Sequence, residues 1–152
     1  MNVLTSRIVC AALMLPLAGT AQAAERFSSS GRADQIVIRV DVSDQQMIVL
    51  RGGRRLYTWP VSTAGEGHVT PRGTWQPQWF SRDHRSSLYE DAPMPFAIFY
   101  DGDYAIHATE AVSALGRPAS HGCVRLSPGH AETLYELVYA LGRRETYIVV
   151  QD

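Results

Sequence analysis

Short β-strand patterns dominate the chain from Gln35 onward, and they restrict its fold more than any other feature. Apolar residues recur at every second position from Ile36 to Val42, which is typical of a half-buried strand. Gly52-Gly53 predicts a tight hairpin turn, because both glycines can adopt positive φ. Further extended patterns cover residues 47–50, 54–61, 74–79, 96–100, 104–107 and 146–150.

One segment predicts a helix strongly. Ser127 can serve as its N-cap, Pro128 suits the first helical position, and Gly142 can end it. Between them, apolar residues recur at helical spacing, at Leu134, Leu137, Val138 and Leu141. A second short helix is expected at residues 110–115, and residues 80–95 are expected to form a long irregular excursion. We therefore predict a mostly β fold, a sandwich or barrel with one main helix packed on it.

The first 23 residues have the pattern of a secretory signal peptide. Arg7 supplies the positive charge, residues 8–17 form a short apolar stretch, and a small-x-small cleavage site ends at Ala23. No small residues directly precede Cys10, as a lipoprotein signal would require, so Cys10 is expected to be lost on cleavage. We therefore expect an exported protein of the bacterial cell envelope, located in the periplasm.

The remaining chain is expected to comprise a short flexible leader at residues 24–34 and one catalytic domain at residues 35–152. Its net charge is near neutral, with −1 for the full chain, and it has no basic stripe, so nucleic acid is not expected as a partner. No second apolar segment suggests a transmembrane anchor, and a monomer is assumed. All 14 basic residues are arginine, which excludes catalysis by a lysine Schiff base or a Ser-Lys pair.

After cleavage, Cys123 is the one cysteine left, in a segment with two histidines. His107 ends a predicted strand, and Ser120-His121-Gly122-Cys123 follows about a dozen residues later. An imidazole close to a thiol can generate the reactive thiolate. Gly122 allows a turn in which peptide N–H groups converge, as an oxyanion hole requires. Arg125 offers a fixed positive charge suited to a substrate carboxylate.

Two other interpretations of Cys123 stay open at this point. His107, His121 and Cys123 could be three ligands of a catalytic zinc with one open position. However, the sequence lacks HExxH, CxxC and the HxE…PCxxC signature. Cys123 could also be an inert core residue. Spacing favours the nucleophile over the metal ligand, and either over the inert residue.

The other three histidines of the chain are not expected to take part in catalysis. His68 lies in a loop rich in Gly, Thr and Pro, where a solvated or lid position is expected. His84 lies in the irregular excursion and is expected to be exposed. His130 is expected on the solvent-facing side of the first helical turn.

Three stretches resemble the L,D-transpeptidase catalytic (YkuD-type) domain family. "IHATEAVSALGRPASHGCVRLS" is similar to the family's signature, a His followed after about a dozen residues by Ser/Thr-His-Gly-Cys. "LRGGRRLYTWPVSTAGEGHVTPRGTW" resembles the family's strand pair and its "PVSTG…TPxGxF" stretch. "APMPFAIFYDGDYAIH" resembles the approach to the first His. The resemblance covers residues 35–150 with its motifs in the right order.

The resemblance implies a role for each matching residue. It makes Cys123 the acyl-accepting nucleophile and His107 the general base, with the backbone carbonyl of Ala108 orienting the imidazole. The family usually has Gly where this chain has Ala108. The resemblance also assigns the substrate cleft and oxyanion hole to Ser120, His121 and Gly122, and substrate binding to Arg125.

The resemblance further implies an L,D-transpeptidase that acts on peptidoglycan stem peptides without metal or organic cofactor. The thiol would form a thioester with the stem, D-Ala would leave, and an acceptor amine would resolve the thioester into a cross-link. With water as acceptor, the same site would be an L,D-carboxypeptidase or a cross-link hydrolase. A zinc hydrolase and a catalytically silent wall-binding module are the alternatives from other classes.

Overall fold

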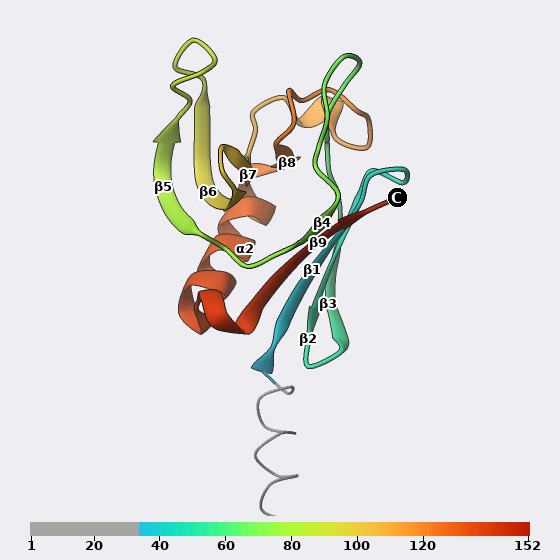
Figure 1. Ribbon diagram of the computed structural model, residues 1–152, viewed down its shortest axis with the longest axis vertical. Coiled ribbons are helices and arrows are strands. Elements are labelled where there is room, and N and C mark those ends of the chain that lie inside the picture. The colour runs from blue at the N-terminus through green and yellow to red at the C-terminus, as the bar shows by residue number, and fades with distance from the viewer. Residues whose placement is uncertain (1–33) are drawn as a thin grey trace, which may run out of the picture.

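The computed structural model describes residues 34–152. The predicted signal peptide and all but the last residue of the predicted leader therefore lie outside the described residues. Within the described part, the strands form two sheets that share one core with a single long helix (Figure 1). The prediction of a mostly β fold with one main helix packed on it is confirmed, and its strands form two sheets.

The first sheet has five strands in the order β3-β2-β1-β9-β4. Their bounds are β1 (Ile36–Asp41), β2 (Gln46–Arg51), β3 (Arg54–Pro60), β4 (Gly73–Trp75) and β9 (Thr146–Gln151). Strands β2 and β3 are joined through Gly52 and Gly53, with φ values of 55° and 79°, as the hairpin turn requires. Strand β1 pairs in parallel with β9, so the first and last strands of the described chain lie side by side in the sheet.

The second sheet has four strands in the order β5-β6-β7-β8. Their bounds are β5 (Trp79–Arg85), β6 (Pro93–Asp101), β7 (Tyr104–Ala108) and β8 (Val124–Leu126). Strand β8 pairs in parallel with β7. On its other side, an antiparallel bridge joins Arg125 to Ser62, in the segment that follows β3. Strand β8 therefore connects the two sheets.

Helix α2 (Pro128–Leu141) packs against β6 and β7 through the buried residues Ala131, Leu134, Tyr135 and Val138. The helix begins and ends where the sequence predicted. Ser127 occupies the N-cap position in an extended conformation, but its side chain makes no capping hydrogen bond. Gly142 ends the helix with φ of 88°. No helix within residues 34–152 combines the length and apolarity needed to cross a membrane.

Three segments differ from the sequence prediction. The excursion expected at residues 80–95 is mostly paired, because β5 and β6 form an antiparallel hairpin around a shorter loop at residues 86–92. Strand β5 alternates weakly because it is a sheet edge with much of its polar surface exposed. The strand expected at residues 74–79 is interrupted, because β4 ends at Trp75 and β5 begins at Trp79. The short helix expected at residues 110–115 is one 3₁₀ turn, η1 (Val112–Ala114).

Alternation in the second sheet decides which side chains enter the core. Ile98 and Ile106 face the main core, together with the β8 residues Val124 and Leu126. Their neighbours on the opposite face, including Phe99 and Ala105, form a small second cluster against which Cys123 packs. Burying each such aliphatic side chain contributes roughly 1.5–3 kcal/mol. The core-facing residues therefore fix which residues of β7 and β8 point to the outer face.

Candidate active site

The parallel pairing of β7 and β8 brings the predicted site residues together. His107 lies opposite Arg125 in the register, and Cys123 precedes Arg125 by two residues. Because alternate residues of a strand point to the same face, all three side chains lie on the outer face of the second sheet. They line one cleft with a volume of about 1120 Å³.

His107 is buried, with 6% of its surface exposed, and its orientation is fixed by one hydrogen bond. Its Nδ1 lies 2.7 Å from the carbonyl oxygen of Ala108. Since a carbonyl can only accept, Nδ1 carries the proton and the neutral ring keeps Nε2 as an acceptor. Burial is the main cause that lowers the pKa of His107 to about 4. The nearby charges of Arg125 and His84 act in the same direction, and the Ala108 hydrogen bond opposes them.

The alanine at position 108 meets no obstacle in the fold. Ala108 is not among the residues with positive φ, and its methyl group is buried in the main core beside β8. Glycine is therefore not required here for conformational reasons. The carbonyl oxygen, which is the group that the resemblance implicates, is in place.

Cys123 is partly buried, and it is a free thiol. Its Sγ lies 3.7 Å from the carbonyl oxygen of Asp103. Burial raises the thiol pKa, while the backbone N–H of Ala105 and the guanidinium of Arg125 act in the opposite direction. With the pKa of the thiol raised and that of His107 lowered, the resting site holds a neutral thiol and a neutral imidazole.

The loop before Cys123 is held by its own side chains and by the segment after β3. The Ser120 hydroxyl donates to the carbonyl of Cys123 at 2.6 Å and accepts the N–H of Gly122 at 3.0 Å. The carbonyl of Thr63 accepts the N–H groups of Ala119 and Ser120. Gly122 has φ of 137°, and a Cβ there would lie 2.5 Å from the Tyr104 ring. The loop therefore requires glycine at position 122.

Arg125 reaches the cleft from β8. Its Nη1 donates to the carbonyl of Ala119 at 3.2 Å. Among the ion pairs of the described chain, none involves Arg125. Its positive charge is therefore not neutralised by a protein carboxylate at hydrogen-bond distance.

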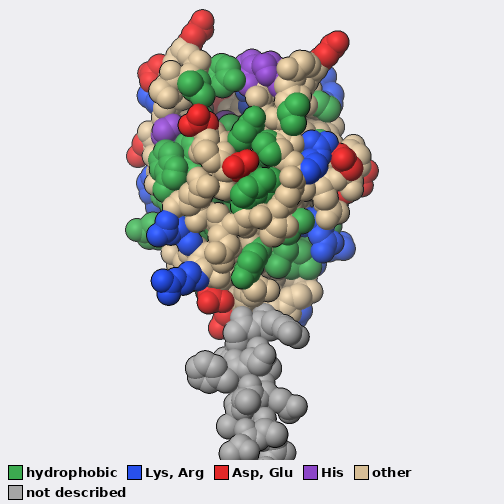
Figure 2. Space-filling view, viewed as in Figure 1, with side chains coloured by type: hydrophobic (Ala, Val, Ile, Leu, Met, Phe, Trp, Pro, Cys, Tyr) green, Lys and Arg blue, Asp and Glu red, His purple; other side chains and the backbone are tan. Residues whose placement is uncertain are grey.

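His121 lines the cleft, and its side chain is exposed. Its ring stacks on Tyr89 with centroids 4.5 Å apart and meets His68 edge-on at 4.6 Å. Figure 2 shows histidine side chains gathered beside a hollow at the upper end of the molecule. Within residues 34–152, no group of three or more His, Cys, Asp or Glu side chains is placed to hold one metal ion. The geometry therefore does not assemble the ligand set of the zinc alternative.

The other three histidines differ in how far they are exposed to solvent. His68 is exposed, as expected. His84 is half-buried, with its ring edge-on to Phe99 at 4.9 Å, so the expectation that it is exposed is wrong. His130 stacks on Trp59 with centroids 4.8 Å apart and has a buried Nδ1, so the expectation that it faces solvent is also wrong.

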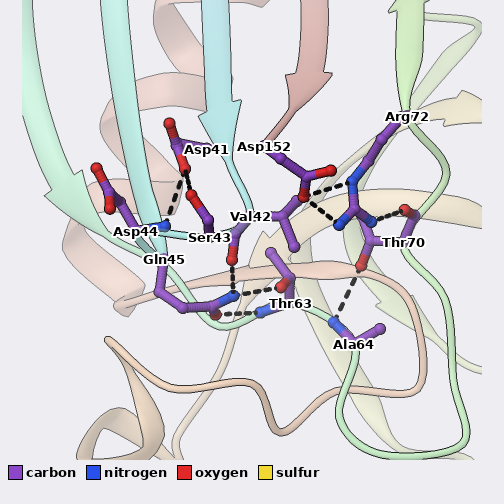
Figure 3. Close-up of polar contacts among 10 residues, drawn as sticks. All are labelled: Asp41, Val42, Ser43, Asp44, Gln45, Thr63, Ala64, Thr70, Arg72 and Asp152. Carbon is purple, nitrogen blue, oxygen red and sulfur yellow. Dashed lines mark hydrogen bonds and ion pairs between the residues drawn. The ribbon is translucent and has the colours of Figure 1, made fainter.

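Sequence reasoning missed the polar side chains that anchor the segment after β3, which in turn binds the loop before Cys123 (Figure 3). Gln45 is buried, and its amide donates to the Thr63 hydroxyl at 2.6 Å and to the carbonyl of Val42 at 2.7 Å. The Gln45 carbonyl oxygen accepts the N–H of Thr63 at 2.9 Å. Nothing in the sequence around Gln45 marks this role, because the contact joins residues 18 positions apart.

Solved structures define the class to which this fold belongs. An L,D-transpeptidase from Mycobacterium smegmatis has a TM-score of 0.69 at 23% identity, covering 78% of this chain and 59% of that chain. One from Stackebrandtia nassauensis has a TM-score of 0.69 at 24% identity, covering 78% and 56%. L,D-transpeptidase 3 from Mycobacterium tuberculosis, in complex with a faropenem-derived adduct, has a TM-score of 0.69 at 20% identity, covering 78% and 60%. The chain therefore has the L,D-transpeptidase fold.

The family follows from the sequence comparison. The family model of the YkuD L,D-transpeptidase catalytic domain matches residues 35–149, so the chain belongs to this family. The resemblance found in the sequence motifs is thereby confirmed. The chain is also 28% identical over 121 residues to YciB of Bacillus subtilis (strain 168), whose name assigns it provisionally to the L,D-transpeptidases. That match covers 65% of this chain and 59% of YciB, so the chain spans less than two thirds of these relatives' length.

Proposed function

We propose that the protein is an exported cysteine L,D-transpeptidase that acts on peptidoglycan stem peptides. One observation carries the proposal. The Ala108 carbonyl binds Nδ1 of the buried His107, which leaves Nε2 as the proton acceptor in the cleft that Cys123 also lines. Membership of the L,D-transpeptidase family supports the same reaction.

In the proposed first half-reaction, the Cys123 sulfur attacks the carbonyl carbon of the third stem residue. His107 Nε2 takes the thiol proton as the S–C bond forms. The resulting oxyanion is stabilised by backbone N–H groups of the loop that contains Gly122. The bond to D-Ala then breaks, the His107 proton passes to the leaving amine, and a thioester remains.

In the proposed second half-reaction, an acceptor amine attacks the thioester. His107 takes a proton from the amine, the new amide forms, and the proton returns to the sulfur as it leaves. Arg125 binds a carboxylate of the stem through its guanidinium, whose two parallel donors suit that group. With water in place of the amine, the same steps would give a carboxypeptidase, and product masses distinguish the two outcomes.

We also propose that the protein works in the periplasm. The support is the signal-peptide pattern in residues 1–23, with its charged start, apolar stretch and small-residue cleavage site. Cell fractionation followed by N-terminal sequencing would test this, with a mature N-terminus at Ala24 as the expected result.

The reaction is tested by incubating the protein with purified disaccharide-tetrapeptides and measuring product masses. Cross-linked dimers with loss of D-Ala are expected. A penem or carbapenem such as faropenem or imipenem should also add its mass to the protein at Cys123, since a neighbour of the same fold was solved with a faropenem-derived adduct. Cys123→Ala is the matched control for both assays. Absence of both products and adducts in the wild-type protein would refute the proposed function.

A further inference from the structure

The hydroxyl of Thr70 links two segments under the candidate site. Thr70 is fully buried, in the loop between β3 and β4. Its Oγ1 donates to the carbonyl of Gly122 at 2.8 Å and accepts the N–H of Ala64 at 3.0 Å, the second of which Figure 3 draws. A single buried hydroxyl thus holds the residue that directly precedes Cys123.

This contact fixes the orientation of one peptide plane. The described chain contains no cis peptide bonds, so the carbonyl of Gly122 and the N–H of Cys123 point in opposite directions. Because Thr70 binds that carbonyl, the N–H of Cys123 must point away from Thr70. A rotation of the plane would break the bond and leave a buried polar group unpaired, which is unfavourable.

Of the backbone N–H and carbonyl groups of Gly122 and Cys123, three are bound within the described residues, and the N–H of Cys123 is left. The Ser120 hydroxyl binds the N–H of Gly122 and the carbonyl of Cys123, and Thr70 binds the carbonyl of Gly122. Within residues 34–152, no acceptor is found for the remaining group, the N–H of Cys123. A donor fixed beside the attacking sulfur is suited to an anion that forms on the substrate carbonyl.

We propose that Thr70 is a positioning residue, which acts through Gly122 to aim the N–H of Cys123 at the oxyanion of the acyl-transfer step. This inference rests on the proposed function. The hydrogen bonds of the Thr70 hydroxyl go to Ala64 and Gly122 and not to the sulfur or to the imidazole of His107, so we expect its effect to be confined to reactions that place negative charge on a carbonyl oxygen.

The backbone of Thr70 is itself anchored. The Arg72 guanidinium donates to the carbonyl of Thr70 at 2.7 Å and pairs with Asp152, just after β9, at 2.5 Å. The carbonyl of Val69 lies only 2.9 Å from where a Cβ on Gly122 would be. The loop of Thr70 therefore packs directly against Gly122, and the hydroxyl has little freedom to move.

Two reactions of the same thiol separate positioning from general structural support. Acylation by imipenem develops charge on a carbonyl oxygen, whereas alkylation by iodoacetamide displaces iodide at a saturated carbon and does not. Thr70→Val is nearly isosteric and removes only the hydroxyl, while Thr70→Ser retains it. Thr146→Val is the matched control, because the Thr146 hydroxyl is also fully buried and donates to the carbonyl of Gly142 at 3.1 Å.

Thr70→Val is expected to lower the acylation rate by about 10²-fold, the order of effect seen when an oxyanion donor is removed or a reacting group is misplaced by about 1 Å. Alkylation should stay within about twofold of wild type. Thr70→Ser should restore most of the acylation rate, and Thr146→Val should leave both rates unchanged. Thermal unfolding of each variant would verify that it is folded in the assay.

Each other result overturns part of the argument. If Thr70→Val acylates as fast as wild type, Thr70 does not position the oxyanion donor. The same conclusion follows if Thr70→Val and Thr70→Ser each lose the acylation and alkylation rates to the same extent. If Thr70→Val does not fold, Thr70→Ser and Thr70→Asn replace it. Thr70→Ser should then keep the wild-type ratio of acylation to alkylation rate, and Thr70→Asn should lower it. The same ratio in both variants would refute the inference. If wild type is alkylated but never acylated by imipenem or stem peptide, the proposed function itself fails.

Discussion

The rate of acylation should depend on pH through His107 with a midpoint near pH 4. Burial lowers the pKa of His107 from its ordinary value of 6.5 to about 4. A general base must be unprotonated to accept the thiol proton, so the rate should rise as pH increases through about 4 and be level by pH 6. A Cys–His site that rested as an ion pair would behave differently, because there the imidazole is protonated near neutral pH.

The free-energy cost of protonating His107 in the folded protein follows from the same pKa shift. Lowering the pKa from 6.5 to about 4 corresponds to roughly 3 kcal/mol against the protonated ring, at about 1.4 kcal/mol per pKa unit. Removing the imidazolium from water is the largest cause, and the positive charge of Arg125 adds to it. Replacing Arg125 by glutamine should therefore move the midpoint to higher pH.

The assay is single-turnover acylation by imipenem, followed by intact mass between pH 3.5 and 8 at constant ionic strength. The second-order rate constant at low imipenem concentration reports the free enzyme. His121→Gln and His68→Gln are matched controls, because both side chains are exposed and their rings contact each other edge-on, whereas His107 is buried. Their profiles should retain the wild-type midpoint.

A midpoint between pH 6 and 7 in the wild-type protein would refute the reasoning. It would mean that the buried site stabilises the imidazolium, and that thiolate and imidazolium coexist at rest. A midpoint that moved with His121→Gln would instead show that His121, and not His107, is the titrating base.

Four further outcomes are expected. Cys123→Ala should abolish turnover of tetrapeptides, measured by product mass, while its thermal unfolding stays close to wild type, because the thiol supplies the covalent step. His107→Ala should slow acylation by about 10²–10⁴-fold, the usual cost of losing a general base, and His121→Ala should slow it much less; the reverse order would identify His121 as the base. Arg125→Lys should weaken turnover although it keeps the charge, and amidation of the stem carboxylates should matter much less in Arg125→Ala than in wild type; unchanged turnover in both variants would assign Arg125 to the surface alone. The free energy of unfolding should fall by up to roughly 3 kcal/mol as pH drops from about 6.5 to about 4, because His107 binds a proton at higher pH in the unfolded chain than in the folded one. Urea unfolding at several pH values measures this, and an equal pH dependence of the unfolding free energy in wild type and His107→Gln would contradict it.

Strands with a clear apolar alternation could be predicted, and edge strands could not. Strand β1 is read directly from its sequence because its alternate residues are buried on one face. Strand β5 was missed because an edge strand gains its hydrogen bonds from one neighbour and needs little apolar surface. Likewise, the residues 110–115 carry helix-forming side chains, yet the loop closes after one 3₁₀ turn.

For the candidate site, sequence patterns identified the chemical groups, and the fold supplies their supports. His107, Cys123 and Arg125 could be predicted as one group because they lie in one motif, and the β7–β8 pairing places them in one cleft. Gln45 and Thr70 were not found, because their contacts to Thr63 and Gly122 join distant parts of the chain. A buried glutamine in a turn carries no local pattern by which its partner could be identified.

The pairing of β1 with β9 has a consequence for when the protein can become active. Strand β9 lies between β1 and β4, so β4 has no neighbour in the first sheet until residues 146–151 are in place. The segment that follows β3 in this sheet also binds β8, and through it the loop of Cys123. A chain that lacked residues 146–151 would thus carry Cys123 without a complete first sheet behind its loop.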